Sequence, residues 1–371
     1  MPIARSDRSV LGRWWWTVDR WTLGGIALLL IFGVFLIQAA SPAGAAHLGQ
    51  SGFYFVERHL LELFIGILIM VGLSLLNPGQ IRFVALLLFV TAFILVVATL
   101  YIGAEVKGAR RWLHLPGLSI QPSEFLKPAF IVLCARLFSR DLETPHFPGR
   151  WLAAGLYVIT AIVLLLQPDM GMTVLISAVF LAQLLLSGAP LKLIGGLVTL
   201  GAGGIGLGYL LLPHVASRIN RFLNPDSGDT YQISRSLEAF RNGGWLGVGP
   251  GEGQVKMSLP DAHTDFIFPV AGEEFGLIAC LVIVAVFAFI VLRGFWRLGK
   301  ETNFFAFLAV AGLLVEFGLQ AIINMGSALH LLPTKGMTLP FISYGGSSLL
   351  SLSIAAGMLL ALTRKHAGPD R

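Results

Sequence analysis

Long apolar segments alternate with polar stretches along this chain, and each segment is long enough to cross a bilayer as a helix, which takes about 20 residues. We place these segments at residues 22–39, 60–76, 82–102, 122–139, 151–167, 170–187, 190–212, 274–292, 303–324 and 345–363. The pattern predicts an all-α polytopic membrane protein with about ten transmembrane helices. An even number of crossings puts both termini on one side of the membrane.

The composition agrees with this pattern. Of the 371 residues, 56% are hydrophobic and 12% are charged, whereas a soluble domain carries about a quarter charged residues, so a water-soluble globule is excluded. Cys134 and Cys280 lie inside apolar segments and offer neither a disulfide framework nor metal-ligand spacing. The net charge of +6 comes without a basic run interleaved with aromatics, so we expect no nucleic-acid partner.

The distribution of Lys and Arg predicts the orientation. These residues concentrate on the cytoplasmic side of membrane proteins, which here places both termini in the cytoplasm. Residues 1–371 then form one membrane domain, with a cytoplasmic segment at 1–21, a large periplasmic loop at 213–273 between the seventh and eighth helices, and a cytoplasmic tail at 364–371. A long charged stretch precedes the first apolar segment, so we do not interpret that segment as a cleavable signal peptide.

The predicted periplasmic loop at 103–121 breaks the charge rule. Lys107, Arg110 and Arg111 lie within five residues of one another, beside Trp112. A basic cluster on the outer side is typical of a site for an anionic ligand at headgroup level. The alternative is that a loop is translocated regardless of its charge, which applies better to the longer loop at 213–273.

That longer loop contains two local patterns. Apolar positions recur with helical spacing over 231–241, with Asp229 or Thr230 as the start and Gly243-Gly244 as the stop, and they predict a short helix along the membrane surface. The glycine-rich run at 247–253 is not preceded by a strand and does not end in a Lys-Ser/Thr pair. We therefore expect a tight backbone path there and not a phosphate-binding loop.

The stretch 259–276 carries the strongest candidates for catalysis. It places several ionisable residues just before a membrane helix: Asp261, His263, Asp265, Glu273 and Glu274. Carboxylates at this depth are costly to bury, so they require an explanation. Pro260 and Pro269 argue against a long helix and favour a re-entrant or extended stretch that lines a cavity. One interpretation is a general base; the other is helix capping by Asp265 and pairing of the two glutamates with a helix dipole.

Polar residues also occur inside the predicted helices. Lys127 at the start of the fourth segment either pairs with Glu124 one turn earlier or faces the same anion as Arg110 and Arg111. In the ninth segment one helix face is polar, and it either forms interhelical hydrogen bonds or provides a polar route to the outer cavity. The residues on that face are Glu316, Gln320 and Asn324.

Two further turns are candidates for lining a site. Asp169, in the turn between the fifth and sixth segments, is expected to cap the following helix. The stretch 331–351 contains two prolines and several glycines, which is typical of an irregular entry into the membrane. It offers Lys335, Ser343 and Tyr344 as polar groups.

Five strings in this order resemble the shape, elongation, division and sporulation (SEDS) family of bacterial membrane proteins. They are KGARRWLHLPGLSIQPSEFLK, QPDMG, GVGPGEGQVK, LPDAHTDFIFPVAGEEFG and LPTKGMTLPFISYGGSS. The resemblance covers roughly residues 20–363, and the last string is more similar to the cell-division branch than to the elongation branch.

The resemblance implies a peptidoglycan glycosyltransferase that polymerises lipid II at the outer face of the cytoplasmic (inner) membrane. It implies a class B penicillin-binding transpeptidase and other division-complex membrane proteins as partners. By motif, the family's essential carboxylate corresponds to Asp265. The expected substrate-binding residues are Lys107, Arg110, Arg111, Glu124, Lys127, His263, Thr264, Lys335, Ser343 and Tyr344. Pro269 departs from the small residue that is usual in the family, which makes the backbone after Asp265 harder to infer.

The implied chemistry is a single inverting displacement. A sugar hydroxyl attacks an anomeric carbon whose leaving group is a lipid diphosphate, so one base suffices, and we assign it to Asp265. Cations, or a divalent ion such as Mg²⁺ or Mn²⁺, stabilise the departing diphosphate, and no organic cofactor is expected. Two alternatives stay open: a flippase for lipid-linked precursors, and a non-catalytic division scaffold.

Overall fold

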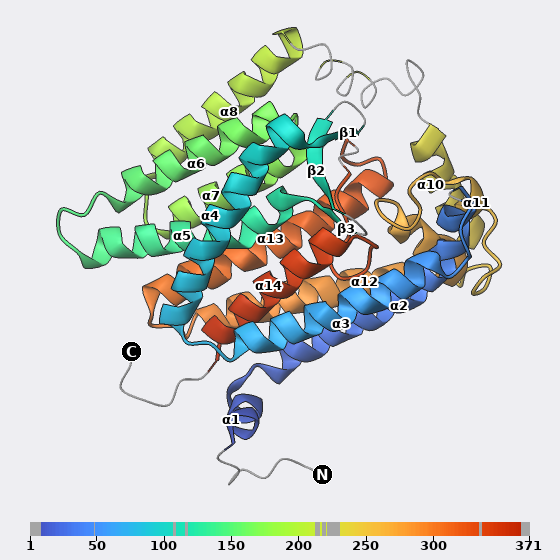
Figure 1. Ribbon diagram of the computed structural model, residues 1–371, viewed down its shortest axis with the longest axis horizontal. Helices are drawn as coiled ribbons and strands as arrows, with labels where there is room; N and C mark the ends of the chain where they lie inside the picture. Colours follow the sequence, from blue (N-terminus) through green and yellow to red (C-terminus); the bar gives the residue numbers. More distant parts are fainter. Residues whose placement is uncertain are drawn as a thin grey trace.

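The structure is a computed structural model that describes residues 9–47, 49–106, 109–115, 118–211, 216, 220, 231–333 and 336–364 (Figure 1). The two terminal segments, Lys107, Lys335, and the predicted helix start at 229–230 lie outside the described residues.

The described residues form a bundle of long helices with a small sheet at one end. In chain order the helices are α1 (Val10–Thr17), α2 (Arg20–His47), α3 (Tyr54–Ser74), α4 (Pro78–Ile102), α5 (Pro122–Glu143), α6 (Gly149–Leu166), α7 (Met170–Leu186), α8 (Leu191–Leu211), α10 (Tyr231–Gly243), α11 (Val255–Ser258), α12 (Ile267–Leu298), α13 (Phe304–Ala328) and α14 (Gly346–Leu362). The strands are β1 (Ala104–Val106), β2 (Ala109–Leu115) and β3 (Leu118–Ile120).

Each apolar segment predicted from the sequence coincides with one helix, among α2–α8 and α12–α14. Six described helices are both long and apolar enough to cross a membrane: α2, α4, α6, α8, α12 and α13. α7 and α14 are shorter apolar helices. The structure is therefore that of a largely helical protein with several candidate membrane spans, and the count of ten crossings stays a prediction.

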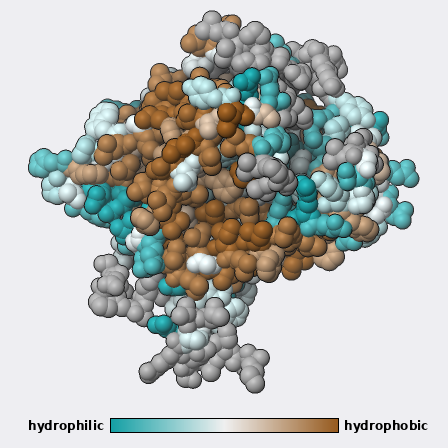
Figure 2. Space-filling view, in the orientation of Figure 1, coloured by the Kyte–Doolittle hydropathy of each residue, from teal (hydrophilic) through white to brown (hydrophobic). Residues whose placement is uncertain are grey.

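The centre of the bundle is formed by α5, α13 and α14. α5 packs against α4, α13 and α14, while α14 also packs along α3. In the apolar window of α13 67% of residues are buried, compared with none in that of α8, which lies at the periphery (Figure 1). Hydrophobic residues form a broad band across the face shown in Figure 2, with hydrophilic residues at its left and right edges. This distribution is expected where a bilayer surrounds the protein.

The ends of the chain that the structure describes meet at one end of the bundle. Trp14 of α1 donates a hydrogen bond from Nε1 to Ser74 Oγ, at 2.8 Å. Arg364, which follows α14, donates to the carbonyl oxygen of Ser74 at 3.3 Å. α1 and the end of α14 thus lie beside the C-terminal end of α3.

The prediction of an all-α protein was wrong in the loop between α4 and α5. That loop forms a three-stranded antiparallel sheet with the order β1-β2-β3. Glu105 pairs with Arg110, and Leu113 pairs with Ile120. The sequence carried a signal, because apolar and aromatic positions there are interrupted by Gly108 and by Pro116-Gly117, the residue types that separate short strands.

The prediction that Pro260 and Pro269 make a long helix unlikely was confirmed for residues 259–266, which form a bend and turns, but was wrong for Pro269. α12 begins at Ile267, so Pro269 lies in the first turn, where backbone N–H groups have no intrahelical partner to lose. The helix is interrupted instead at Gly276, which has φ 76° and ψ −176°. A Cβ at Gly276 would meet backbone atoms of Trp245 and Gly247. Only glycine adopts these dihedral angles without strain and also lets the backbone at Trp245 and Gly247 lie this close.

Candidate functional site

Asp265 is the last residue but one of an irregular stretch that leads into α12. The backbone N–H groups of Thr264 and Phe266 donate to the carbonyl oxygen of Asp261, at 3.1 and 3.2 Å, and fold this stretch into a turn. The N-cap of α12 is Phe266, and no side chain caps the helix. Asp265 is half-buried and does not serve as the cap. The alternative interpretation of Asp265 as a capping residue was therefore wrong.

A polar face on α13 holds the turn in place. Asn324, 2% exposed, donates from Nδ2 to the carbonyl oxygens of Asp265 at 3.0 Å and Met337 at 2.6 Å. Its neighbour one turn away, Gln320, donates from Nε2 to the carbonyl oxygen of Thr338 at 3.1 Å. The predicted polar face thus lies against protein and forms interhelical hydrogen bonds, one of the two outcomes that the sequence left open.

Lys127 joins α5 to the same face of α13. Its Nζ donates to Gln320 Oε1 at 2.8 Å and lies 2.9 Å from Glu124 Oε2 and 3.5 Å from Glu316 Oε1. The predicted pairing with Glu124 is present. Because Lys127 is only 1% exposed, its ammonium group has no accessible surface for a ligand in this conformation.

The two arginines of β2 lie in different surroundings. Adjacent residues of a strand point to opposite faces of the sheet. Arg111 donates to the carbonyl oxygens of Gln167 at 3.2 Å and Pro168, and lies 3.5 Å from Asp169. Arg110 pairs with Glu105 at 3.5 Å, and its side chain is 50% exposed. The expected compact cluster is thus divided into an anchored cation and an exposed one.

The turn between α6 and α7 connects Arg111 to the buried ions. Asp169 caps α7 as predicted, because its Oδ1 accepts a hydrogen bond from the backbone of Met172 at 3.3 Å. Asp169 also lies close enough to Glu124 and Lys127 for their charges to act on it. Arg111 therefore belongs to the same charged region as Lys127.

An aromatic cluster supports the turn from the side of α3. The ring of His263 stacks on Phe55 with centroids 4.0 Å apart, and the backbone N–H of Tyr344 donates to the carbonyl oxygen of His263 at 2.9 Å. Burial lowers the pKa of His263, although Asp261 opposes this shift. Burial, assisted by the charge of Glu62, raises the pKa of Tyr344 to about 12. Both rings are therefore neutral at pH 7.

Other predicted site residues have local structural contacts. Thr264 Oγ1 donates to the carbonyl oxygen of Asp261 at 3.2 Å. Ser343 Oγ accepts from the backbone N–H of Leu339 at 2.8 Å and stabilises the irregular entry before α14. Lys335 precedes Gly336, where an added Cβ would lie 3.4 Å from Asp265 Oδ2. Gly336 therefore comes close to the candidate base.

Glu273 and Glu274 bind partners other than the helix dipole, which was one of the two interpretations left open by the sequence. Glu273 Oε1 accepts from the backbone N–H groups of Gln254 and Val255, at 2.9 and 2.8 Å. Glu274 forms a buried ion pair with Lys256, a residue that no pattern in the sequence singled out. These contacts hold the glycine-rich run against α12, so its tight path serves packing.

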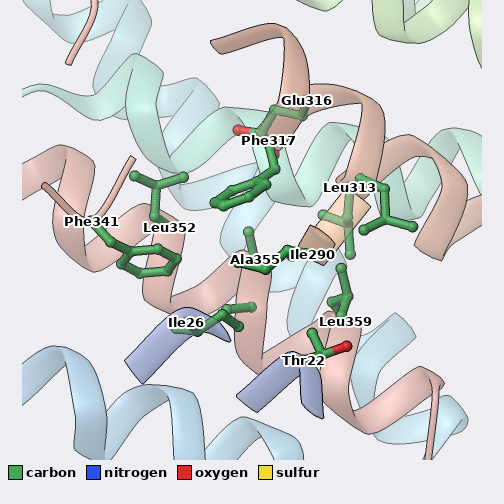
Figure 3. Close-up of a pocket in the computed structure, with 12 residues that line it drawn as sticks. Thr22, Ile26, Ile290, Leu313, Glu316, Phe317, Phe341, Leu352, Ala355 and Leu359 are labelled. Atoms are coloured by element: carbon green, nitrogen blue, oxygen red, sulfur yellow. The ribbon is translucent and has the colours of Figure 1, made fainter. Parts of the chain in front are cut away.

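A small cavity within the bundle has too little room for a substrate. It has a volume of about 20 Å³ and lies between α2, α12, α13 and α14, with Glu316 at its edge (Figure 3). A space of this size holds about one water molecule. In the described part of the chain, no group of three or more His, Cys, Asp or Glu side chains is arranged to hold a metal ion.

The fold and this region define a class: a helical membrane protein with a group of ionisable residues at one end of the bundle, around the start of α5, the turn before α12 and the entry to α14. The sequence profile described as "Cell cycle protein", named for FtsW, RodA and SpoVE, matches residues 20–368. This chain belongs to that family, which confirms the resemblance seen in its motifs.

Two relatives of this chain carry the same name. The chain is similar to the probable peptidoglycan glycosyltransferase FtsW of Caulobacter vibrioides, with 46% identity over 98% of this chain and 94% of the relative. It is 38% identical to the protein of the same name from Trichlorobacter lovleyi, over 91% of each chain.

Two solved structures share the fold. One is the rod shape determining protein RodA of Thermus thermophilus, with a TM-score of 0.71 and 23% identity, covering 94% of this chain and 97% of that one. The other comes from a peptidoglycan synthase complex that coordinates polymerization and crosslinking, with a TM-score of 0.77 and 24% identity, covering 93% and 97%.

Proposed function

We propose that this chain is a peptidoglycan glycosyltransferase of the FtsW type, which polymerises lipid II during cell division. Family membership and the names of the relatives support the reaction class. The observation that carries the assignment of the site is the position of Asp265. It is the carboxylate in a turn that is held by Asn324, on the same helix face that binds Lys127.

In the proposed reaction the 4-hydroxyl of the acceptor sugar attacks the anomeric carbon of the donor. Asp265 accepts the hydroxyl proton as the new carbon–oxygen bond forms and the bond to the lipid diphosphate breaks with inversion. The diphosphate leaves as an anion and needs no proton from a general acid. Positioning supplies part of the rate, since an unperturbed aspartate is a weak base.

The proposed cations differ in how directly they act. Arg110 is exposed enough to contact the diphosphate, and we assign direct contacts also to Lys107 and Lys335. Arg111 and Lys127 are paired with carboxylates of the protein that offset their charge, so we assign them to shaping the site. We assign Glu124 the role of holding Lys127. We assign His263, Thr264, Ser343 and Tyr344 the role of supporting the turn that carries Asp265.

We assign no step to a metal, because the described residues do not form a ligand cluster. A requirement for Mg²⁺ or Mn²⁺ is tested by chelation, with polymer formation as the readout.

For topology, we propose ten crossings of the inner membrane, with both termini in the cytoplasm and Asp265 on the periplasmic side. For partners, we propose a class B penicillin-binding transpeptidase and other division proteins. The similarity to a chain from a peptidoglycan synthase complex supports the first of these.

The decisive experiment is lipid II polymerisation by the purified protein in proteoliposomes, alone and with a transpeptidase. Asp265→Asn should abolish glycan chains while the protein stays folded and membrane-inserted. Asp261→Asn, four positions away in the same turn, is the matched control and should retain polymerisation. An active Asp265→Asn protein would remove Asp265 from its role. Translocation of labelled lipid II without glycan formation would identify a flippase, and wild-type protein without either activity would identify a scaffold.

A further inference from the structure

Three arginines gather at the end of the bundle away from Asp265. Arg82 lies in the first turns of α4, and Arg136 and Arg140 lie one turn apart near the end of α5. Positions 127 and 140 of α5 are separated by about 20 Å at 1.5 Å per residue, so this cluster is remote from the ion pairs around Lys127. We call these three residues the arginine cluster.

The members of the arginine cluster are held close together. α4 packs along α5, and Arg82 and Arg140 lie near enough to Arg136 for their charges to act on it. The guanidinium of Arg82 lies 4.7 Å from the ring centroid of Phe305, at the start of α13, and that of Arg140 lies 5.6 Å from the ring of Phe147. Aromatic faces thus fix two of the three cations.

The neighbouring carboxylates do not neutralise this charge. Glu143 lies 3.9 Å from Arg136 and also accepts a hydrogen bond from Ser139. Asp141 pairs with Arg150 at 3.0 Å and is occupied there. Among the residues that the structure describes, the three guanidinium groups therefore have one paired carboxylate between them, and repulsion among them is unfavourable unless a further anion binds.

The surroundings indicate where that anion comes from. Phe83, next to Arg82, is 61% exposed, and Leu142, two positions after Arg140, is 51% exposed. Exposed apolar side chains beside clustered arginines match the boundary between acyl chains and headgroups. Basic sites between helices at the cytoplasmic side of membrane proteins bind anionic lipids.

We propose that the arginine cluster binds the phosphodiester headgroup of an anionic phospholipid, in the leaflet opposite the one that Asp265 faces. The guanidinium groups donate hydrogen bonds to the phosphate oxygens, and the exposed side chains of Phe83 and Leu142 contact the acyl chains. A lipid with two phosphodiesters, such as cardiolipin, neutralises the excess of positive charge better than a lipid with one.

The test is native mass spectrometry of the full chain in detergent, titrated separately with cardiolipin, phosphatidylglycerol and phosphatidylcholine. We expect binding in that order, with phosphatidylcholine weakest. The triple variant Arg82→Gln, Arg136→Gln, Arg140→Gln should weaken cardiolipin binding about a hundredfold, if each cation that contacts the bound headgroup contributes about fivefold. The triple Arg→Lys variant at the same positions keeps the charge and should bind within a few-fold of wild type.

The control is the double variant Lys192→Gln, Lys300→Gln, which removes two cations outside the cluster and should change binding less than twofold. If the triple Gln variant fails to fold, the single variants provide the measurement, at about fivefold each. Equal binding of cardiolipin by the triple Gln variant and wild type would overturn the proposal. So would equal affinity for phosphatidylcholine, or displacement of cardiolipin by millimolar pyrophosphate, which would assign the cluster to a soluble diphosphate.

Discussion

The two hydrogen bonds of Asn324 provide the sharpest test of how Asp265 is positioned. Asn324→Leu keeps the approximate size of the side chain and removes both donors. The carbonyl oxygens of Asp265 and Met337 then lose their partner, which costs about 1–3 kcal/mol for each. The substitution also removes Asn324 Oδ1, a buried oxygen without a hydrogen-bond partner, and this offsets about one such cost.

The net cost is therefore about 2 kcal/mol, and it falls on the turn that carries Asp265 and on the segment of Met337 that packs against it. If that free energy is lost from the reactive geometry, kcat for lipid II polymerisation should fall about thirtyfold, with little change in KM. Gln320→Glu is the matched control, because it keeps an acceptor for Lys127 and alters the contact with Thr338 without touching Asp265. It should reduce kcat much less than Asn324→Leu.

Initial rates of glycan formation across a range of lipid II concentrations separate kcat from KM, and thermal unfolding in the same detergent monitors folding. Asn324→Leu should also have no effect on the residual rate of Asp265→Asn, since the base that it positions is then absent. The reasoning would be refuted by a folded Asn324→Leu protein with the kcat of wild type.

Three further predictions concern stability. Lys127→Met leaves Glu124 and Glu316 buried without their cation and should lower the free energy of unfolding, measured by thermal unfolding, by about 3–5 kcal/mol. Adding Glu316→Gln to this variant should restore part of the lost stability. If the two substitutions instead destabilise the protein additively, the ion cluster is contradicted. Gly276→Ala should lower the free energy of unfolding by at least about 3 kcal/mol. Gly155→Ala, where an added Cβ meets nothing within 4 Å, should leave stability unchanged or raise it. Equal changes in stability for the two variants would contradict the strained interruption of α12. Burial lowers the pKa of His263 in the folded state, so its contribution to stability is present above the ordinary histidine pKa of 6.5 and is lost as the pH falls below that value. His263→Phe should therefore flatten the dependence of Tm on pH between about 7 and 5, and an unchanged slope would contradict the prediction.

The hydropathy pattern located the long helices well because lipid, unlike water, requires a span to satisfy its own backbone groups and to present apolar side chains. The segment predicted at 303–324 is α13, and the one at 82–102 is α4. The motifs of 259–276 and 331–351 likewise identified the segments that meet around Asp265. Local residue types were sufficient for the cap at Asp169 and for the helix α10, whose place along the membrane surface stays a prediction.

Local patterns failed where the outcome depended on contacts between distant segments. Pro269 was tolerated because of its place in the first turn of α12, and the true interruption at Gly276 is imposed by the backbone at 245–247. Arg110 and Arg111 are adjacent in sequence, yet the pairing of β2 directs one outward and the other to Asp169. Glu273 and Glu274 bind 254–256, a segment whose position no helical periodicity could indicate.

The sequence by itself determined the membrane class, the apolar helices and the family, since each of these depends on residue types and their order along the chain. Only the tertiary structure decided which charges are available to a ligand. Lys127 became an internal counter-ion between Glu124 and Glu316, whereas Arg110 stayed at the surface. The physical reason is that the cost of burying a charge depends on the partners that the packed helices bring to it, and those partners come from residues far away in the chain.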